Sequence, residues 1–380
     1  MSFRTPIVIV TIVVAVMNLI SNYTDALPSS KKVVAALAAL LVIDLLFLLP
    51  NICNLRYLVT VQRSLEAAIG RFLLRIGTDR LIQKAGLIHQ TKIVNGIPMH
   101  YYERPGGGPT LLLCHGITSE SKNLAALVLE LQAKLPNNWR MIAPDMVGHG
   151  HDLQRVQELG IDQFPYPEPE DLGESMKALL DALEIRKCYA YGSSMGGCLV
   201  YFLQQRYPEL VEKSILISPA LEVVLDDQFL EDWRMGRKNH FCWESRDDVK
   251  TFMADLSCPQ RIKCNPIPPF MLEAIWQDRQ ARTPDGHFRK CFQKLLDCQG
   301  KDPVLACNSD IAPNAKRLVL WPEQDYIANY ERGKTFFAKS SKNTIFRSIP
   351  DCGHLFHSDG RTVMIHAAPM MIDYLLTDTK

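Results

Sequence analysis

The sequence predicts an α/β fold with a mostly parallel, eight-stranded sheet flanked by helices, and three observations carry this prediction. Short apolar runs alternate with helical patterns from Thr110 onward. Strands that alternate with helices need crossover connections, which place neighbouring strands parallel. Residues 219–311 interrupt this alternation with helical patterns, and residues 1–54 are strongly apolar. We therefore expect a sheet domain with a helical insertion and an apolar amino-terminal segment.

The predicted strands begin with an antiparallel hairpin. His89 to Val94 and Met99 to Arg104 flank Asn95-Gly96, a pair that tolerates the positive φ of a tight turn. The other six predicted strands are Thr110 to Cys114, Trp139 to Ala143, Cys188 to Tyr191, Ser214 to Ser218, Arg317 to Trp321 and Thr344 to Ile349. The core is thus expected over residues 89–218 and 312–380, with residues 219–311 forming a helical cap.

Composition and charge exclude some classes of protein. The 42 Lys and Arg residues nearly balance the 41 Asp and Glu residues, for a formal net charge of +1. Such a chain has no field that gathers polyanions, so nucleic acid is not expected as a partner. The 11 cysteines show no metal-ligand spacing and are expected to be reduced, although those between Cys242 and Cys307 could form a bridge in an oxidising lumen. Neither metal nor cofactor is predicted, and the oligomeric state is left open.

Two apolar runs, Ile7 to Ile20 and Val33 to Leu49, predict a membrane anchor in residues 1–54 with one or two transmembrane helices. Three arrangements fit: an uncleaved hairpin or two-pass anchor, a single signal anchor, or a cleaved signal peptide. Insertion of the second run is favoured narrowly, because Asp44 costs about 2.5 to 3.5 kcal/mol while the apolar residues return about 4 to 7 kcal/mol.

The side of the membrane that holds the main domain stays open. Four arginines after the second run, Arg56, Arg63, Arg71 and Arg75, favour the cytoplasm, whereas Lys31 and Lys32 in the intervening loop oppose this. Asn22-Tyr23-Thr24 is a glycosylation sequon only if that loop is lumenal.

Residues 55–88 are expected to form a basic amphipathic helical linker. Apolar residues recur at helical spacing with arginines between them: Leu58, Val61, Leu65, Ile69, Phe72, Leu73 and Ile76. Such a helix lies either on the membrane surface or against the main domain.

A candidate nucleophile, Ser194, follows the predicted strand Cys188 to Tyr191. Gly192-Ser193-Ser194-Met195-Gly196 has the G-x-S-x-G pattern, in which the glycines leave room for a sharp turn that exposes the serine hydroxyl. The pattern alone is weak, because chains of this length contain it often by chance. Its position between a strand and an amphipathic segment is what supports the assignment.

A serine hydroxyl needs a base and an orienting carboxylate, because it is protonated at neutral pH. His354 is the expected general base and Asp325 the expected orienting acid, with Glu323 or Asp351 as substitutes for the acid. Each candidate follows a predicted strand, so the carboxyl ends of a parallel sheet bring them together.

An oxyanion hole is expected from two backbone N–H groups. They belong to Ile117, after the strand Thr110 to Cys114, and to Met195, after the serine. The histidines His115, His149 and His151 are interpreted as structural or loop-shaping.

Together these motifs resemble the α/β-hydrolase superfamily over roughly residues 89–378. The resemblance rests on His115-Gly116, the loop from Ala143 to Gly150, the elbow from Gly192 to Gly196, Asp325, and Cys352-Gly353-His354. Within this superfamily the apolar amino terminus, the S-x-M-G-G elbow and the cap are similar to the membrane-bound monoacylglycerol lipases. One departure from the family pattern is His151, where many relatives have serine.

The resemblance and the residues together predict a membrane-anchored serine hydrolase that cleaves lipid esters, most simply mono- or diacylglycerol, through an acyl-serine. A bilayer-dissolved substrate would enter under an apolar cap containing Pro268, Pro269, Phe270, Met271 and Trp276. Two alternatives remain: a thioesterase or carbon–carbon bond hydrolase on the same scaffold, and a catalytically dead membrane binding or scaffold protein.

Overall fold

A computed structural model describes residues 55–238, 240–257, 267–297, 312–355 and 361–377. It separates into two compact units, one of residues 1–79 with 267–281 and the other of residues 80–266 with 282–380. The predicted anchor in residues 1–54 lies outside the described residues. Among the helices that are described, none combines the length and apolar character needed to cross a membrane.

One eight-stranded sheet forms the centre of the larger unit, with the order β1-β2-β4-β3-β5-β6-β7-β8. Its strands are β1 (Ile88–Val94), β2 (Ile97–Arg104), β3 (Thr110–Cys114), β4 (Arg140–Pro144), β5 (Cys188–Ser193), β6 (Val211–Ile217), β7 (Lys316–Pro322) and β8 (Thr344–Ile349). The pairs β1·β2 and β2·β4 are antiparallel, and the other pairs are parallel. The predicted mostly parallel, eight-stranded α/β sheet is thus confirmed.

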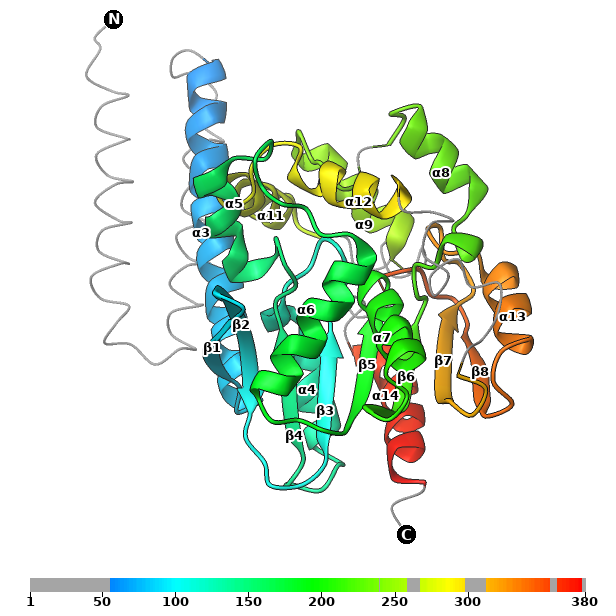
Figure 1. Ribbon diagram of the computed structural model, residues 1–380. Coiled ribbons are helices and arrows are strands. Elements are labelled where there is room, and N and C mark those ends of the chain that lie inside the picture. The colour runs from blue at the N-terminus through cyan, green and yellow to red at the C-terminus, as the bar shows by residue number, and fades with distance from the viewer. Residues whose placement is uncertain (1–54, 239, 258–266, 298–311, 356–360, 378–380) are drawn as a thin grey trace, which may run out of the picture. The chain divides into compact units, whose positions relative to one another are not determined.

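Helices cover both faces of this sheet (Figure 1). The core helices are α4 (Ala125–Gln132), α5 (Leu153–Leu159), α6 (Pro169–Ala182), α7 (Met195–Arg206), α13 (Tyr330–Ala338) and α14 (Arg361–Leu376), with 3-10 turns η1 (Ser121–Leu124), η2 (Gly150–Asp152) and η3 (Glu222–Val224). Buried residues of α4 and α14 pack with Leu111 and Leu113 of β3 on one face. On the other face α7 contacts α6, β5 and β6, and its Tyr201 ring lies against Phe337 of α13.

The segment between β6 and β7 is helical in its described parts. It contains α8 (Asp227–Arg234), α9 (Arg246–Leu256), α11 (Pro269–Arg282) and α12 (His287–Asp297). In Figure 1, α8, α9 and α12 lie beyond the carboxyl ends of the parallel strands. A cluster of buried aromatic rings joins α8 and α12, since the Phe292 centroid lies 4.8 Å from those of Trp233 and Phe241 and 5.6 Å from that of Phe229. The cap therefore has an apolar core of its own.

The smaller unit pairs α3 (Leu55–Lys84) with most of α11. A Cβ on Gly70 would lie 2.5 Å from Cβ of Ala274 and 2.8 Å from the Phe270 carbonyl oxygen, so the two helices approach closely only because residue 70 has no side chain. Arg71 also donates to Gln277 (2.5 Å). These contacts group residues 267–281 with α3, whereas the sequence predicts that they belong to one cap of residues 219–311.

Candidate active site

The candidate nucleophile Ser194 stands at the turn between β5 and α7. Its φ of 55° and ψ of −121° are sparsely populated for a residue with a side chain, and such strain is common at functional sites. Hydrogen bonds hold the turn in place: the Ser194 N–H donates to the Ile217 carbonyl oxygen (2.9 Å), and its own carbonyl accepts from Cys198 (3.0 Å) and Ala220 (3.1 Å). The serine is thus fixed at the carboxyl end of β5.

Two glycines make this turn sterically possible. A Cβ on Gly192 would lie 2.1 Å from the Gly196 carbonyl oxygen, and a Cβ on Gly196 would lie 2.4 Å from the Cys114 carbonyl oxygen. Real Cβ atoms do not approach other atoms this closely. A larger residue at position 192 would push β5 away from α7, and one at position 196 would push α7 away from the end of β3. The glycine pattern seen in the sequence is therefore a packing requirement of the turn.

The imidazole of His354 is held by Asp325. Its Nδ1 lies 2.9 Å from Oδ1 and 2.8 Å from Oδ2 of that carboxylate. The Asp325 side chain is fully buried, and its Oδ1 also accepts from the backbone N–H groups of Ile327 (2.9 Å) and Ala328 (2.8 Å). The expected substitutes Glu323 and Asp351 are exposed, whereas the carboxylate hydrogen-bonded to His354 is that of Asp325.

The second ring nitrogen of His354 is the one available for proton transfer. Because Nδ1 faces a carboxylate, the neutral ring carries its proton there and has a lone pair on Nε2. That Nε2 atom is buried and has no hydrogen-bond partner among the described residues, Ser194 included. A buried acceptor without a partner is costly, which is typical of a position reserved for a substrate or a reacting group.

The loop after β3 approaches the serine. A Cβ on Gly116 would lie 3.5 Å from Cβ of Ser194. Ile117 follows this glycine, and Met195 begins α7, where first-turn N–H groups have no acceptor within the helix. The predicted donor Ile117 thus follows a residue that lies beside Ser194, and the predicted donor Met195 lies at a helix amino terminus, which favours negative charge.

Two buried histidines brace the oxyanion loop, which we define as residues 115–121. Nε2 of His115 accepts from the Met146 N–H (3.1 Å), and Nε2 of His149 lies 2.6 Å from the Ile117 carbonyl oxygen. Burial lowers the pKa of His115 and lowers that of His149 to about 3, the latter also through the nearby His115 and His287 rings. Both rings are therefore neutral in the folded protein at neutral pH.

Asp145 ties the oxyanion loop to the loop after β4. Its carboxylate accepts from the Ser121 N–H (2.8 Å) and from both the backbone N–H and the ring of His151 (3.0 and 2.9 Å). Burial alone would raise the pKa of Asp145, but these hydrogen bonds and the nearby His115 outweigh burial and lower it. His151 thus shapes this pair of loops.

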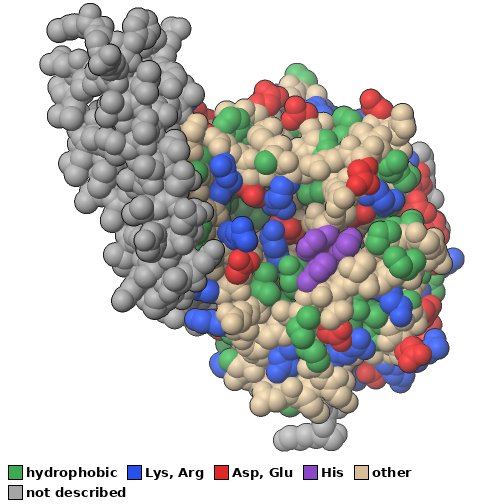
Figure 2. Space-filling view, turned by 90° about the vertical axis from the view of Figure 1, so that its left-hand side faces the viewer, with side chains coloured by type: hydrophobic (Ala, Val, Ile, Leu, Met, Phe, Trp, Pro, Cys, Tyr) green, Lys and Arg blue, Asp and Glu red, His purple; other side chains and the backbone are tan. Residues whose placement is uncertain are grey.

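The outer face of His151 belongs to a surface stack of histidines. Its ring centroid lies 4.1 Å from that of His89 and 5.2 Å from that of His100, which Figure 2 shows as one patch. Partial burial, followed by the charge of His151, lowers the pKa of His89 and His100. Within the described part of the chain, no cluster of histidine, cysteine or acidic residues is arranged to hold a metal ion.

The described cysteines are free thiols: Cys114, Cys188, Cys198, Cys242, Cys291 and Cys352. The remaining cysteines considered for a bridge in the cap lie outside the described residues.

A family model described as the alpha/beta hydrolase fold matches residues 109–361. This match covers more than half of the chain, so the protein belongs to the α/β-hydrolase family, and the predicted superfamily is confirmed.

Individual relatives match shorter stretches. The chain is 30% identical over 124 residues to uncharacterised mycobacterial proteins, a match that spans 33% of their length. It is 31% identical over 192 residues to a serine hydrolase-like protein of Danio rerio, covering 48% of this chain and 55% of the relative. It is 29% identical over 140 residues to sn-1-specific diacylglycerol lipase ABHD11 of Xenopus tropicalis, covering 36% and 39%.

Solved structures share the fold at lower identity. A putative lipase of Acinetobacter baumannii AYE aligns with a TM-score of 0.63 at 20% identity, covering 80% of this chain and 97% of that one. A membrane phospholipase A aligns with a TM-score of 0.63 at 19% identity, covering 84% and 96%.

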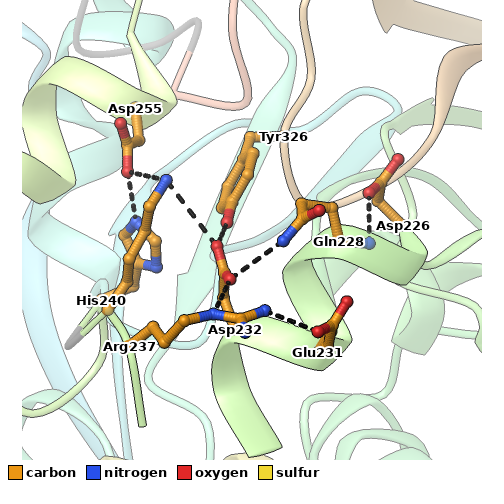
Figure 3. A network of polar contacts seen from close by, with 9 residues as sticks. Asp226, Gln228, Glu231, Asp232, Arg237, His240, Asp255 and Tyr326 are labelled. Carbon is orange, nitrogen blue, oxygen red and sulfur yellow. Dashed lines mark hydrogen bonds and ion pairs between the residues drawn. The ribbon is translucent and has the colours of Figure 1, made fainter. Parts of the chain in front are cut away.

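Sequence reasoning missed a polar cluster beside the acid. Tyr326, the residue after Asp325, donates its hydroxyl proton to Asp232 of α8 (Figure 3). Their separation by 94 positions gives no local pattern, and the only available signal was an aromatic residue directly next to the candidate acid.

Proposed function

We propose that this protein is a serine hydrolase that cleaves lipid carboxylic esters, with mono- or diacylglycerol as the substrate class. One observation carries the proposal: the His354 ring is anchored through Nδ1 by buried Asp325, while its Nε2 is buried and unpartnered among the described residues. Strained Ser194 directly follows β5, at the same carboxyl edge of the sheet. This combination is what a hydroxyl nucleophile needs and serves no evident purpose in packing.

In the proposed reaction the Ser194 hydroxyl oxygen attacks the ester carbonyl carbon, and Nε2 of His354 takes the hydroxyl proton. The N–H groups of Ile117 and Met195 stabilise the oxyanion of the tetrahedral intermediate. When the C–O bond breaks, His354 passes the proton to the leaving alcohol, leaving an acyl-serine. Water, deprotonated by the same histidine, then releases the fatty acid and restores the hydroxyl.

The lipid class rests on three supports. Relatives and structural neighbours include proteins named as a diacylglycerol lipase, a lipase and a membrane phospholipase A. The helical cap has an aromatic core, and the apolar runs in residues 1–54 suit a membrane anchor that keeps the enzyme at the surface where its substrate diffuses. Membrane attachment and the acylglycerol class are accordingly parts of this proposal.

The test compares hydrolysis of monoolein, diolein and oleoyl-CoA by the purified full chain in mixed micelles, alongside the Ser194→Ala variant. We expect the acylglycerols to give the larger kcat/KM and Ser194→Ala to release no fatty acid above the uncatalysed rate.

Faster turnover of oleoyl-CoA would replace the acylglycerol assignment with a thioesterase. Absence of turnover on all three substrates, together with absence of labelling by a fluorophosphonate, would instead favour the membrane-bound scaffold.

A further inference from the structure

The loop that carries Asp325 is paired with the segment that enters the cap. We call residues 325–329 the acid loop. Asp226 N–H donates to the Ile327 carbonyl oxygen (2.9 Å), Asn329 N–H donates to the Val224 carbonyl oxygen (2.7 Å), and Leu225 forms an antiparallel bridge with Ala328. The first residues of the cap and the acid loop therefore form one short backbone ladder.

Helix caps reinforce this ladder. Asp226 begins α8 by accepting from the Gln228 N–H (2.9 Å) with one carboxylate oxygen, and its other oxygen accepts from the Asn329 side chain (2.9 Å). Asn329 in turn caps α13 by accepting from the Arg332 N–H (3.1 Å). The acid loop thus ends at a residue that is fixed to both helices.

Tyr326 is the side chain of the acid loop that enters the cap (Figure 3). Its hydroxyl donates to Oδ2 of Asp232, the ammonium of Lys238 lies 4.2 Å from its ring centroid, and the His240 ring lies 5.4 Å from it. Asp232 is buried and also accepts from Arg237 (2.6 Å) and Gln228 (3.0 Å). The hydrogen bond from Tyr326, followed by that from Arg237, lowers the pKa of Asp232 to about 2, so the carboxylate is charged at neutral pH.

The same cluster reaches the loop that carries His354. Asp255 of α9 accepts from Lys238 (2.9 Å) and His240 (3.0 Å). The next residue, Leu256, accepts through its carbonyl from the Leu355 N–H (2.6 Å), and a Cβ on Gly353 would lie 2.5 Å from that carbonyl oxygen. Gln324 N–H also donates to the Cys352 carbonyl oxygen (3.0 Å). The cap therefore touches the residues on both sides of the Asp325–His354 contact.

From this arrangement we propose that Tyr326 and Asp232 are positioning residues, through which the cap sets the geometry of the Asp325–His354 pair. The inference rests on the proposed function, because it assigns a role in turnover to groups that touch neither Ser194 nor His354 directly. It predicts that removing the tyrosine hydroxyl slows proton transfer without weakening the binding of substrate.

The experiment measures p-nitrophenyl butyrate hydrolysis by the full chain, with the concentration of active sites counted by fluorophosphonate titration. Tyr326→Phe should lower kcat per titrated site on the order of 10-fold, with KM changed by less than about twofold. A misfolded fraction would lower the number of titrated sites instead, so the count separates positioning from folding.

Tyr207→Phe is the matched control. Its hydroxyl also donates to a carboxylate, that of Glu174 in α6 (2.6 Å), and Tyr207 directly follows α7 rather than lying in the acid loop. This variant should keep the wild-type kcat.

Asp232→Asn supplies a second variant if Tyr326→Phe does not fold, and the double variant tests whether the two residues act together. If the two residues act through one contact, kcat of the double variant should fall no further than kcat of the more impaired single variant. Wild-type kcat in Tyr326→Phe, or losses that multiply in the double variant, would overturn the proposal. Failure of the proposed function itself would appear differently, as wild-type protein that is not labelled at Ser194.

Discussion

The nucleophile elbow and the acid loop lie at the same edge of the sheet but are held in different ways. The elbow depends on contacts with the sheet. Gly192 and Gly196 let β5, α7 and the end of β3 approach one another, and the Ser194 N–H donates a hydrogen bond to the Ile217 carbonyl oxygen. The acid loop depends on the cap, through the ladder to residues 224–226 and through Tyr326.

This difference has a physical consequence. Short-range steric contacts in a close-packed interior leave a residue few alternative positions, so the elbow should survive changes in the cap. A loop held by a buried polar network depends on every member of that network. We therefore expect the orientation of the base, rather than the placement of the nucleophile, to respond to the cap.

The largest loss of activity is expected from Asp325→Asn, which acts on the acid loop. An amide at this position can no longer hold the His354 proton on Nδ1 as a carboxylate does, so kcat should fall by about 10⁴-fold while the fold is kept. Steady-state hydrolysis and a thermal unfolding curve would measure the two properties together.

Glu323→Gln and Asp351→Asn are the controls, because both side chains are exposed and neither contacts His354. If either of them lost as much activity as Asp325→Asn, the assignment of the acid would be wrong.

A smaller effect is expected from Gly196→Ala, which tests the elbow. The added Cβ would lie 2.4 Å from the Cys114 carbonyl oxygen and 2.5 Å from that of His115, so α7 must shift away from β3. A shift of this kind at the nucleophile should cost about 10²-fold in kcat/KM. Gly107→Ala, where a Cβ would meet nothing within 4 Å, should leave kcat/KM unchanged. Equal activities for the two variants would show that the elbow tolerates more than its sterics imply.

The last prediction concerns stability rather than turnover, and it tests the pH response of the oxyanion loop. Burial lowers the pKa of His149 from 6.5 to about 3. Between pH 6.5 and about pH 3 this histidine is therefore protonated in the unfolded chain but not in the folded protein. The free energy of unfolding should therefore decrease as the pH falls through this window, with His149 contributing up to about 1.4 kcal/mol per pH unit. In His149→Gln, whose amide can still donate to Ile117, urea unfolding at several pH values should show a shallower slope. An unchanged slope would mean that His149 is not a buried neutral ring.

Much of the fold was predictable because the strands are short apolar runs whose pattern is local. The predicted strand boundaries were wrong where a polar residue that interrupts an apolar run has a hydrogen-bond partner far away in the sequence. The sequence places the start of β6 at Ser214, because Lys213 interrupts the apolar run, whereas the strand begins at Val211. The buried Lys213 ammonium donates to the Tyr374 carbonyl oxygen (2.8 Å), a partner 161 positions away. Ser218, expected to end the strand, instead has φ of 38° and begins the turn into the cap.

In the candidate site, too, local patterns were predictable and long-range contacts were not. Ser194, Asp325 and His354 could be proposed as site residues because each follows a strand, and a parallel sheet brings those ends together. The contacts of Tyr326 with the cap could not be found, since they depend on how α8 and α9 pack over the acid loop. Likewise the association of residues 267–281 with α3 depends on a close helix crossing at Gly70, which no periodicity reveals.

We propose that Ser194 is the nucleophile served by His354 and Asp325. Treatment of the purified full chain with a fluorophosphonate, followed by peptide mass spectrometry to locate the adduct, would test this assignment. We expect one adduct per chain, on Ser194, with none in Ser194→Ala and strongly slowed labelling in His354→Ala. An adduct on Ser193 or on any other residue, or labelling that persists in Ser194→Ala, would contradict it.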